Sequence, residues 1–115
     1  MTSIFIPTLN CSISFSIGKD AENNIEILKN ANNNDIWFHL DNQSSCHVIA
    51  HIPENKTLNK KQKNKIIVQG ALLCKMRSKL KSDKNVGICY SEVKNVTLTD
   101  IPGTVNVSNK KIVFI

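Results

Sequence analysis

A period of two in the apolar residues of three short segments is the feature that most limits how this chain can fold. The segments cover residues 12–17, 35–40 and 46–52. Because successive side chains of a β-strand point to opposite faces, a period of two predicts strands that each bury one face. Only the five residues "DNQSS" separate the last two segments, so we expect these to pair as a hairpin or near-hairpin. The apolar positions are Ile13, Phe15 and Ile17, then Ile36, Phe38 and Leu40, then Cys46, Val48, Ala50 and Ile52.

The rest of the chain predicts a short helix and a run of closing strands. Asp20 can cap a helix that continues to about Ala31, before the loop "NNN". Another β-rich segment, "SIFIPTL", precedes residue 12, and four more follow residue 84, with a turn at "DIPG". We therefore expect a single α+β domain over residues 1–115, with a mainly antiparallel sheet that carries two helices.

A long second helix is expected between residues 64 and 82, from "NKIIVQGALLCKMRSKLKS". We place its start near Asn64, because the three lysines between residues 60 and 63 would each oppose the helix dipole by ~0.3–1 kcal/mol in a first turn. Lys79 and Lys81 then lie in the last turn, where the dipole favours positive charge. The helix carries an apolar stripe of Ile66, Leu73, Met76 and Leu80 and a small-residue stripe of Ile67, Ala71, Cys74 and Ser78.

The composition indicates one core and a reducing environment. With 115 residues, of which 41% are hydrophobic, the chain can bury a core of useful size. No apolar run approaches the ~18 residues of a membrane span, and the N-terminal stretch lacks the basic start of a signal peptide. The four cysteines, at positions 11, 46, 74 and 89, form no C-x-x-C pair, which favours reduced thiols over disulfides or a zinc site. We expect a cytoplasmic protein.

Positive charge is concentrated in the middle of the chain. Residues 54–85 contain ten Lys or Arg and two acids, a net charge of +8, whereas residues 1–53 carry −3 and residues 86–115 carry +1. A local excess of this size favours a polyanionic partner. A solvated lysine surface without any partner is the alternative.

The stretch "DIWFHLDNQSSCHVIAH" contains all three histidines and the only tryptophan. On the predicted strands Trp37, His39, His47 and His51 lie opposite the apolar face. A metal shared by His47 and His51 is disfavoured, since four residues of extended strand separate them by about 13 Å. His39 and His47 could approach each other across the hairpin but lack a third ligand, because Cys46 points to the other face.

A contact surface explains these residues better than catalysis does. An indole and imidazoles on an open sheet face can stack on unpaired bases, at ~1–3 kcal/mol per base. If the histidines faced phosphate, affinity should rise below pH ~6.5. The alternative is that Trp37 packs beneath a helix and that the histidines are part of the core.

Six segments occur in the order and spacing of a known domain: "GKDAENN", "DIWFH", "SSCHV", "GALLCKMRSKLK", "VGICYSEVK" and "PGTV". With them the chain, from about Gly18 to its end, resembles the NFACT-R domain, the RNA-binding module of the NFACT ribosome quality-control proteins. Thr97 and Leu98 stand where many members carry basic residues. The positions that match the motifs are Gly18, Lys19, Asn24, Asp35, Trp37, His39, Ser45, His47, Val48, Ser78, Lys79, Lys81, Tyr90, Lys94 and Gly103.

The resemblance implies a non-enzymatic module that contacts tRNA or ribosomal RNA, with DNA as an alternative polyanion. No catalytic residue, metal, cofactor or membrane partner is expected. The expected phosphate contacts are Lys19, Lys75, Arg77, Lys79, Lys81 and Lys94. The expected base or sugar contacts, or organisers of their surface, are Trp37, His39 and His47, and the expected hydrogen-bond partners are Asn24, Ser45 and Ser78.

Two other function classes stay open at this point. One is a metal-dependent hydrolase or nuclease built on His39, His47 and Cys46. The other is a protein-interaction module in which the small-residue stripe of the long helix docks a partner helix.

Overall fold

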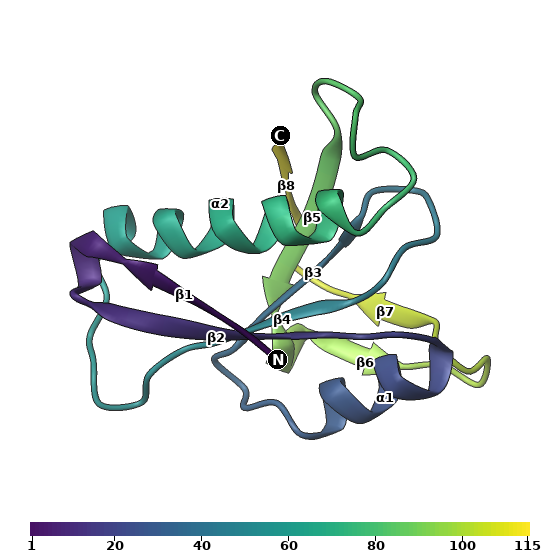
Figure 1. The fold of residues 1–115 in the computed structure, drawn as a ribbon. Coiled ribbons are helices and arrows are strands. Elements are labelled where there is room, and N and C mark those ends of the chain that lie inside the picture. Colours follow the sequence, from purple (N-terminus) through teal and green to yellow (C-terminus); the bar gives the residue numbers. More distant parts are fainter.

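A computed structural model describes residues 1–115 and contains eight strands, two α-helices and two short 3-10 helices (Figure 1). In chain order they are β1 Thr2–Ile6, η1 Pro7–Leu9, β2 Cys11–Ile17, α1 Ala21–Lys29, β3 Ile36–Leu40, β4 Val48–His51, α2 Lys60–Met76, β5 Gly87–Glu92, η2 Val93–Asn95, β6 Val96–Leu98, β7 Val105–Val107 and β8 Lys111–Phe114.

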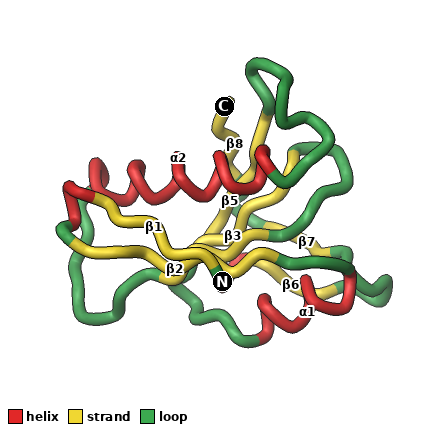
Figure 2. Tube along the Cα trace, viewed as in Figure 1, coloured by secondary structure: helices red, strands yellow, loops and turns green.

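Six strands form one antiparallel sheet in the order β1-β2-β4-β3-β5-β8, and β6 and β7 pair separately (Figure 2). The predicted pairing of β3 with β4 is confirmed, with Trp37 opposite Ile49. The protein is therefore an α+β domain with a mainly antiparallel sheet and two helices, as its sequence pattern predicts.

Helix α2 covers one face of the sheet (Figure 1). The apolar positions of the alternating segments point to this face, and Phe15, Phe38 and Val48 are fully buried there. Gly70 lets the helix approach closely, because a Cβ atom at this position would lie 2.3 Å from the ring of Phe38. Each fully buried side chain of this size contributes roughly 1.5–3 kcal/mol relative to exposure.

Helix α1 and the β6–β7 hairpin cover the other face (Figure 1). A second, smaller core forms there around Trp37 and Ile49, with Leu28 from α1 and Val96 from β6. The central strand β3 is therefore buried on both faces. The alternating apolar positions of residues 35–40 predict that only one face of this strand is buried, and the structure differs in this respect.

The predicted start and end of α2 are wrong. The helix begins at Lys60, because Asn59 and Gln62 form a capping box in which each side chain accepts from the other residue's backbone N–H. Such a cap stabilises the helix by about 1 kcal/mol, and each residue added to the helix forms a further backbone hydrogen bond. Together these gains offset the unfavourable interaction of the lysine charges with the positive end of the helix dipole. The helix ends at Met76, with Arg77 as its C-cap. The predicted last-turn residues Lys79 and Lys81 lie in the turn that follows.

The two stripes of α2 also differ from the prediction. Ala71 and Cys74, from the small-residue stripe, are fully buried against the sheet, whereas Met76, from the apolar stripe, is 57% exposed. Small residues are required on this side of α2 because the helix approaches the sheet closely at Gly70. This stripe is thus unavailable to a partner helix, and the interaction module based on it is ruled out in this structure.

Other local predictions are confirmed. Asp20 caps α1, accepting from the backbone N–H of Asn23 at 2.8 Å. All four cysteines are free thiols, two of them fully buried. Neither helix has the length and apolar character to cross a membrane.

Candidate nucleic-acid interface

Three aromatic rings pack together where β3 ends and β4 begins. The indole of Trp37 lies parallel to the imidazole of His39, with centroids 5.7 Å apart, because alternate residues of β3 share a face. The His47 imidazole meets both edge-on, at 5.6 Å from Trp37 and 5.0 Å from His39. We call Trp37, His39 and His47 the ring cluster.

Most of the ring cluster is buried, so the prediction of an open stacking surface is wrong for two of its members. Trp37 is 2% exposed and His47 3% exposed, whereas His39 is half-buried. Trp37 cannot receive a base on its indole face in this structure. The alternative expectation, that Trp37 packs beneath a helix, is confirmed, because Trp37 lies in the buried cluster that contains Leu28 of α1.

Hydrogen bonds define where each imidazole of the ring cluster carries its proton. The indole N–H of Trp37 can only donate, so His47 accepts it at Nδ1 over 3.1 Å, and a neutral His47 is protonated at Nε2. His39 does the reverse, since its Nδ1 lies 2.7 Å from the carbonyl oxygen of Leu40 and must donate to it. Neutral His39 therefore has an unprotonated Nε2.

Both imidazoles are shifted toward the neutral form. Burial, and then the neighbouring His39, lower the pKa of His47 to about 4. Burial also lowers the pKa of His39, although its hydrogen bond to Leu40 opposes this. A rise in affinity through protonation of His47 near pH 6.5, considered from the sequence, is therefore not expected.

The ring cluster forms the floor of a hollow of about 570 Å³, which we call the ring hollow. Its walls come from the loop between β3 and β4 and from the β6–β7 hairpin. Lys110 lies at its edge, where it pairs with Asp41 at 3.6 Å. The lining residues, besides the ring cluster, are Leu40, Asp41, Asn42, Gln43, Ser44, Ser45, Cys89, Gly103, Thr104, Val105, Asn106, Val107 and Lys110.

A second hollow, of about 800 Å³, adjoins the first. We call it the basic hollow, because Lys19 and Arg77 line it and Asp20 is its only acid. The two hollows share Ser44, Ser45, Gly103 and Thr104. The basic hollow is lined by Met1, Thr2, Ile17, Gly18, Lys19, Asp20, Ala21, Asn24, Ser44, Ser45, Cys46, Arg77, Pro102, Gly103 and Thr104.

Gly18 and Asn24 join the basic hollow to the ring cluster. The backbone N–H of Gly18 donates to the carbonyl of His47 at 2.9 Å, and the backbone N–H of His47 donates to Asn24 Oδ1 at 3.2 Å. A Cβ atom on residue 18 would lie 1.7 Å from Asn24 Oδ1, which explains the glycine. The Asn24 oxygen is thus engaged within the protein, and only its Nδ2 has no protein partner.

The hydroxyls of Ser45 and Ser78, predicted to contact nucleic acid, are engaged in the protein. Ser45 Oγ accepts from the backbone of Leu40 at 3.0 Å and donates to the carbonyl of Cys46 at 2.9 Å. Ser78 Oγ donates to the carbonyl of Lys75 at 2.7 Å and accepts from a backbone N–H two residues later. Both hydroxyls shape the turns that hold the interface.

The predicted phosphate contacts do not all lie together. Lys75 donates to the carbonyl oxygen of Ile115 at 3.1 Å. Lys94 pairs with Glu92 at 3.6 Å and lines a separate hollow of about 460 Å³ on the α2 side. Lys79 and Lys81 are exposed and line neither of the joined hollows. The structure brings together Lys19 and Arg77, with Lys110 as a cation that sequence reasoning missed.

Cys46 is an unusual thiol in the basic hollow. A hydrogen bond with Cys74 and the charge of Arg77 lower its pKa to about 7, although burial acts in the opposite direction. The same contact with Cys46, together with burial, raises the pKa of Cys74. Cys46 is a half-buried free thiol that lines the basic hollow together with Arg77, whose positive charge favours the thiolate form.

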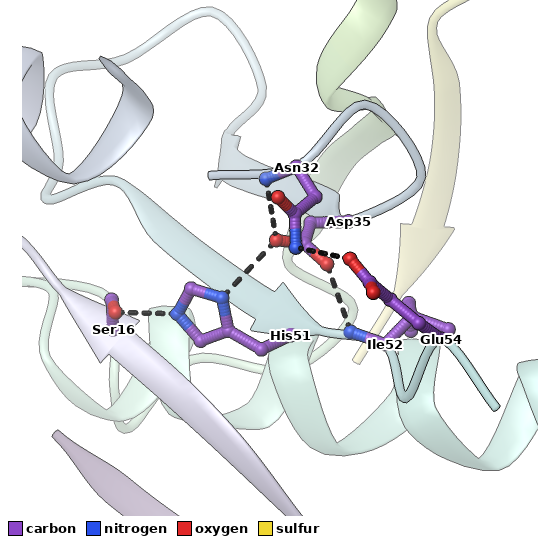
Figure 3. A network of polar contacts seen from close by, with 6 residues as sticks. All are labelled: Ser16, Asn32, Asp35, His51, Ile52 and Glu54. Carbon is purple, nitrogen blue, oxygen red and sulfur yellow. Dashed lines mark hydrogen bonds and ion pairs between the residues drawn. The ribbon is translucent and has the colours of Figure 1, made fainter. Parts of the chain in front are cut away.

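A hydrogen-bonded chain of Ser16, His51 and Asp35 was also missed (Figure 3). Ser16 Oγ lies 2.6 Å from His51 Nε2, and His51 Nδ1 lies 3.1 Å from Asp35 Oδ2. The pairing of Ile36 with Ala50 was the signal, because it makes Asp35 and His51 neighbours across the hairpin.

This chain has the order of a hydrolase triad, but it lies outside the three hollows described here. Asp35 is 1% exposed and also accepts from the backbone N–H groups of Asn32 and Ile52, both at 2.9 Å (Figure 3). Burial alone would raise the pKa of Asp35, but these bonds and His51 keep it below its ordinary value. The chain therefore ties β2, β3 and the end of β4 together.

No group of three or more His, Cys, Asp or Glu side chains is placed to hold a metal ion. The two Nδ1 atoms of His39 and His47 are already hydrogen-bonded within the protein. The geometry thus offers no support for the metal-dependent hydrolase.

The family model described as the NFACT protein RNA binding domain matches residues 1–109 of this chain. The chain belongs to this family. The match begins before Gly18, where the resemblance in the sequence first became recognisable, and includes β1 and β2. The protein is thus a member of an RNA-binding domain family, and its joined hollows are lined by several of the family motif residues.

Two relatives place this NFACT RNA-binding domain in larger proteins. Coiled-coil domain-containing protein 25 of Danio rerio is 31% identical over an alignment of 93 residues, gaps included, and the alignment covers 72% of this chain and 40% of that protein. The C-terminal structure of the fibronectin/fibrinogen-binding protein of Streptococcus suis superposes with a TM-score of 0.74 at 20% identity, over 90% of this chain and 40% of that one. The chain spans less than half of either relative, and the second likeness shows the fold alone.

Proposed function

We propose that this domain is a non-enzymatic module of the cytoplasm that binds structured RNA, such as tRNA or ribosomal RNA, across the basic and ring hollows. The observation that carries the proposal is the junction of the two hollows at Ser44–Ser45 and Gly103–Thr104. Cations from three separate parts of the chain thus line two adjoining hollows, with Lys19 and Arg77 in the basic hollow and Lys110 in the ring hollow.

The chemistry of these adjoining hollows suits a nucleic-acid backbone beside exposed sugar or base groups. Arg77 has a planar guanidinium that can hold a phosphate through two parallel hydrogen bonds. Lys19 and Lys110 act as additional point charges. With about three phosphate contacts, the logarithm of the affinity should fall with the logarithm of salt concentration with a slope of roughly −2 to −3.

Titration of fluorescently labelled tRNA and of a ribosomal RNA fragment, followed by anisotropy, tests the proposal. Arg77→Glu reverses a charge in the basic hollow and is expected to lower affinity about tenfold or more. The salt slope should also become shallower by roughly 1, because one phosphate contact is lost.

Lys65→Glu is the matched control. Lys65 is exposed on α2, lies outside the three hollows, and stands 12 residues before Arg77, about 18 Å along a helix. The same change of two charge units at this position is expected to alter affinity less than about twofold. Equal losses for both variants would mean that attraction is only long-range and that the hollows are not the binding surface.

A further inference from the structure

Two imidazole nitrogens of the ring cluster have no hydrogen-bond partner in the protein. Every fully buried side-chain nitrogen or oxygen in the structure has a partner, so the Nε2 atoms of His39 and His47 must both retain some access from outside. Both residues line the ring hollow. His47 is otherwise 97% buried, and among the three hollows it lines the ring hollow alone.

These two nitrogens are chemically complementary. His47 Nε2 carries a proton and donates, because its Nδ1 accepts from Trp37. His39 Nε2 accepts, because its Nδ1 donates to Leu40. The two rings meet edge to face with centroids 5.0 Å apart and both line the ring hollow, so its lining contains a donor and an acceptor on adjacent side chains.

From this arrangement we propose that the ring hollow receives a single unpaired nucleotide of the bound RNA. The inference rests on the function proposed above and names the part of the RNA that this site recognises. Each nucleobase carries adjacent donor and acceptor groups on its pairing edge, and a ribose hydroxyl can both donate and accept. Either group meets the neutral pair formed by His39 and His47.

Size and surroundings agree with one nucleotide. A volume of about 570 Å³ lies within the ~300–1,000 Å³ of sites that enclose small ligands. Lys110 at the edge can take the nucleotide's phosphate by exchanging its exposed contact with Asp41, a surface pair worth at most about 1 kcal/mol. The nucleotide must be unpaired, because the pairing edge of a base within a helix is already occupied and stacked.

The test compares two RNA hairpins whose paired strands are joined by a polyethylene-glycol linker in place of a nucleotide loop, one fully paired and one with a single-nucleotide bulge that carries 2-aminopurine. Wild-type protein is expected to bind the bulged hairpin at least about fivefold more tightly, the lower end of what one captured base contributes. The 2-aminopurine emission should change on binding. In addition, the imidazole NMR signals of His39 and His47 should shift with the bulged hairpin and not with the paired one.

His39→Phe keeps a ring stacked on Trp37 and removes the acceptor Nε2. This variant is expected to lose most of the preference for the bulge, measured as the ratio of its affinities for the two hairpins. Arg77→Glu is the control, since it should weaken both hairpins alike and leave their ratio unchanged.

The outcomes separate this inference from the proposed function. If wild-type protein binds both hairpins equally, the single-nucleotide site is wrong and RNA binding stands. Binding to neither hairpin would remove the proposed function itself. A preference for the bulge that survives in His39→Phe, or unshifted imidazole signals in the wild type, would mean that the nucleotide lies elsewhere.

Discussion

Acid should destabilise this domain well before its carboxylates titrate, because His47 is held neutral. Its pKa is lowered from 6.5 to about 4 by burial and by His39. As pH falls below 6.5, the His47 imidazole therefore binds a proton in the unfolded chain but stays neutral in the folded chain until the pH approaches 4. The stability contributed by the neutral imidazole is complete above pH 6.5 and is lost progressively as pH falls toward 4.

The size of the effect follows from these two pKa values. A single group with pKa 6.5 unfolded and about 4 folded lowers the free energy of unfolding by about 2 kcal/mol between pH 7 and pH 5. The pKa of His39 is lowered as well, so it acts in the same direction. The pKa of Asp35 is below its ordinary value and makes no contribution in this interval.

Urea unfolding at both pH values, followed by the emission of the only tryptophan, measures this difference. His47→Gln is the matched variant, because a glutamine oxygen can accept from Trp37 but does not titrate. Its unfolding free energy should fall by about 2 kcal/mol less than that of the wild type over the same interval. Equal pH dependence of the two proteins, or a wild-type His47 NMR signal that titrates near pH 6.5, would refute the reasoning.

Three further predictions concern α2, the Cys46 thiol and the buried carboxylate. Gly70→Ala should destabilise the domain by about 1–3 kcal/mol through the clash with Phe38, whereas Asn64→Ala on the exposed side of α2 should be neutral or stabilising by up to ~0.7 kcal/mol. Equilibrium denaturation that ranks the two the other way would contradict the close helix–sheet packing. Alkylation of Cys46 by iodoacetamide, read by mass spectrometry, should reach half its maximal rate near pH 7, and a midpoint near 9 would show that its thiol is unperturbed. Asp35→Asn should lower the free energy of unfolding by about 2–3 kcal/mol, because an amide cannot accept from all three donors around it, and an unchanged urea midpoint would disprove that role.

The strands and their pairing could be predicted because alternation is a local signal. Every second residue of these strands, counted from Phe38 and Val48, is apolar and points to one face, and that face became the main core. The cover over Trp37 could not be predicted in the same way. It comes from α1 and from the β6–β7 hairpin, which lie distant in the sequence and whose short segments do not indicate where they will pack.

The start of α2 was misplaced because two local effects compete there. Lysines near the positive helix end are unfavourable, but the reciprocal cap between Asn59 and Gln62 is stronger. The buried side of the helix is broader than the two stripes predict. Ile66, Leu73 and Leu80 of the apolar stripe pack on the core, and Gly70 and Ala71 let the small-residue side pack there as well.

The candidate site was only partly visible in the sequence. Residue types identified Lys19, Arg77, His39 and His47, but the hydrogen bonds that hold Ser45 and Ser78 require coordinates. Lys110 escaped notice because its motif lies outside the segments that carry the resemblance. Its proximity depends on the β6–β7 hairpin reaching over the end of β3.

The Asp35 carboxylate makes the start of β3 more strongly held by hydrogen bonds than its end. Where β3 starts, one anion clamps a loop, a neighbouring strand and the chain leaving it, so local opening there should require most of the global unfolding energy. Where β3 stops, residues 42–44 are exposed and line the ring hollow. RNA that enters the ring hollow would thus contact residues 42–44 and not the strongly held start of β3. Protection from deuterium exchange gained on binding should therefore appear at residues 42–44 first.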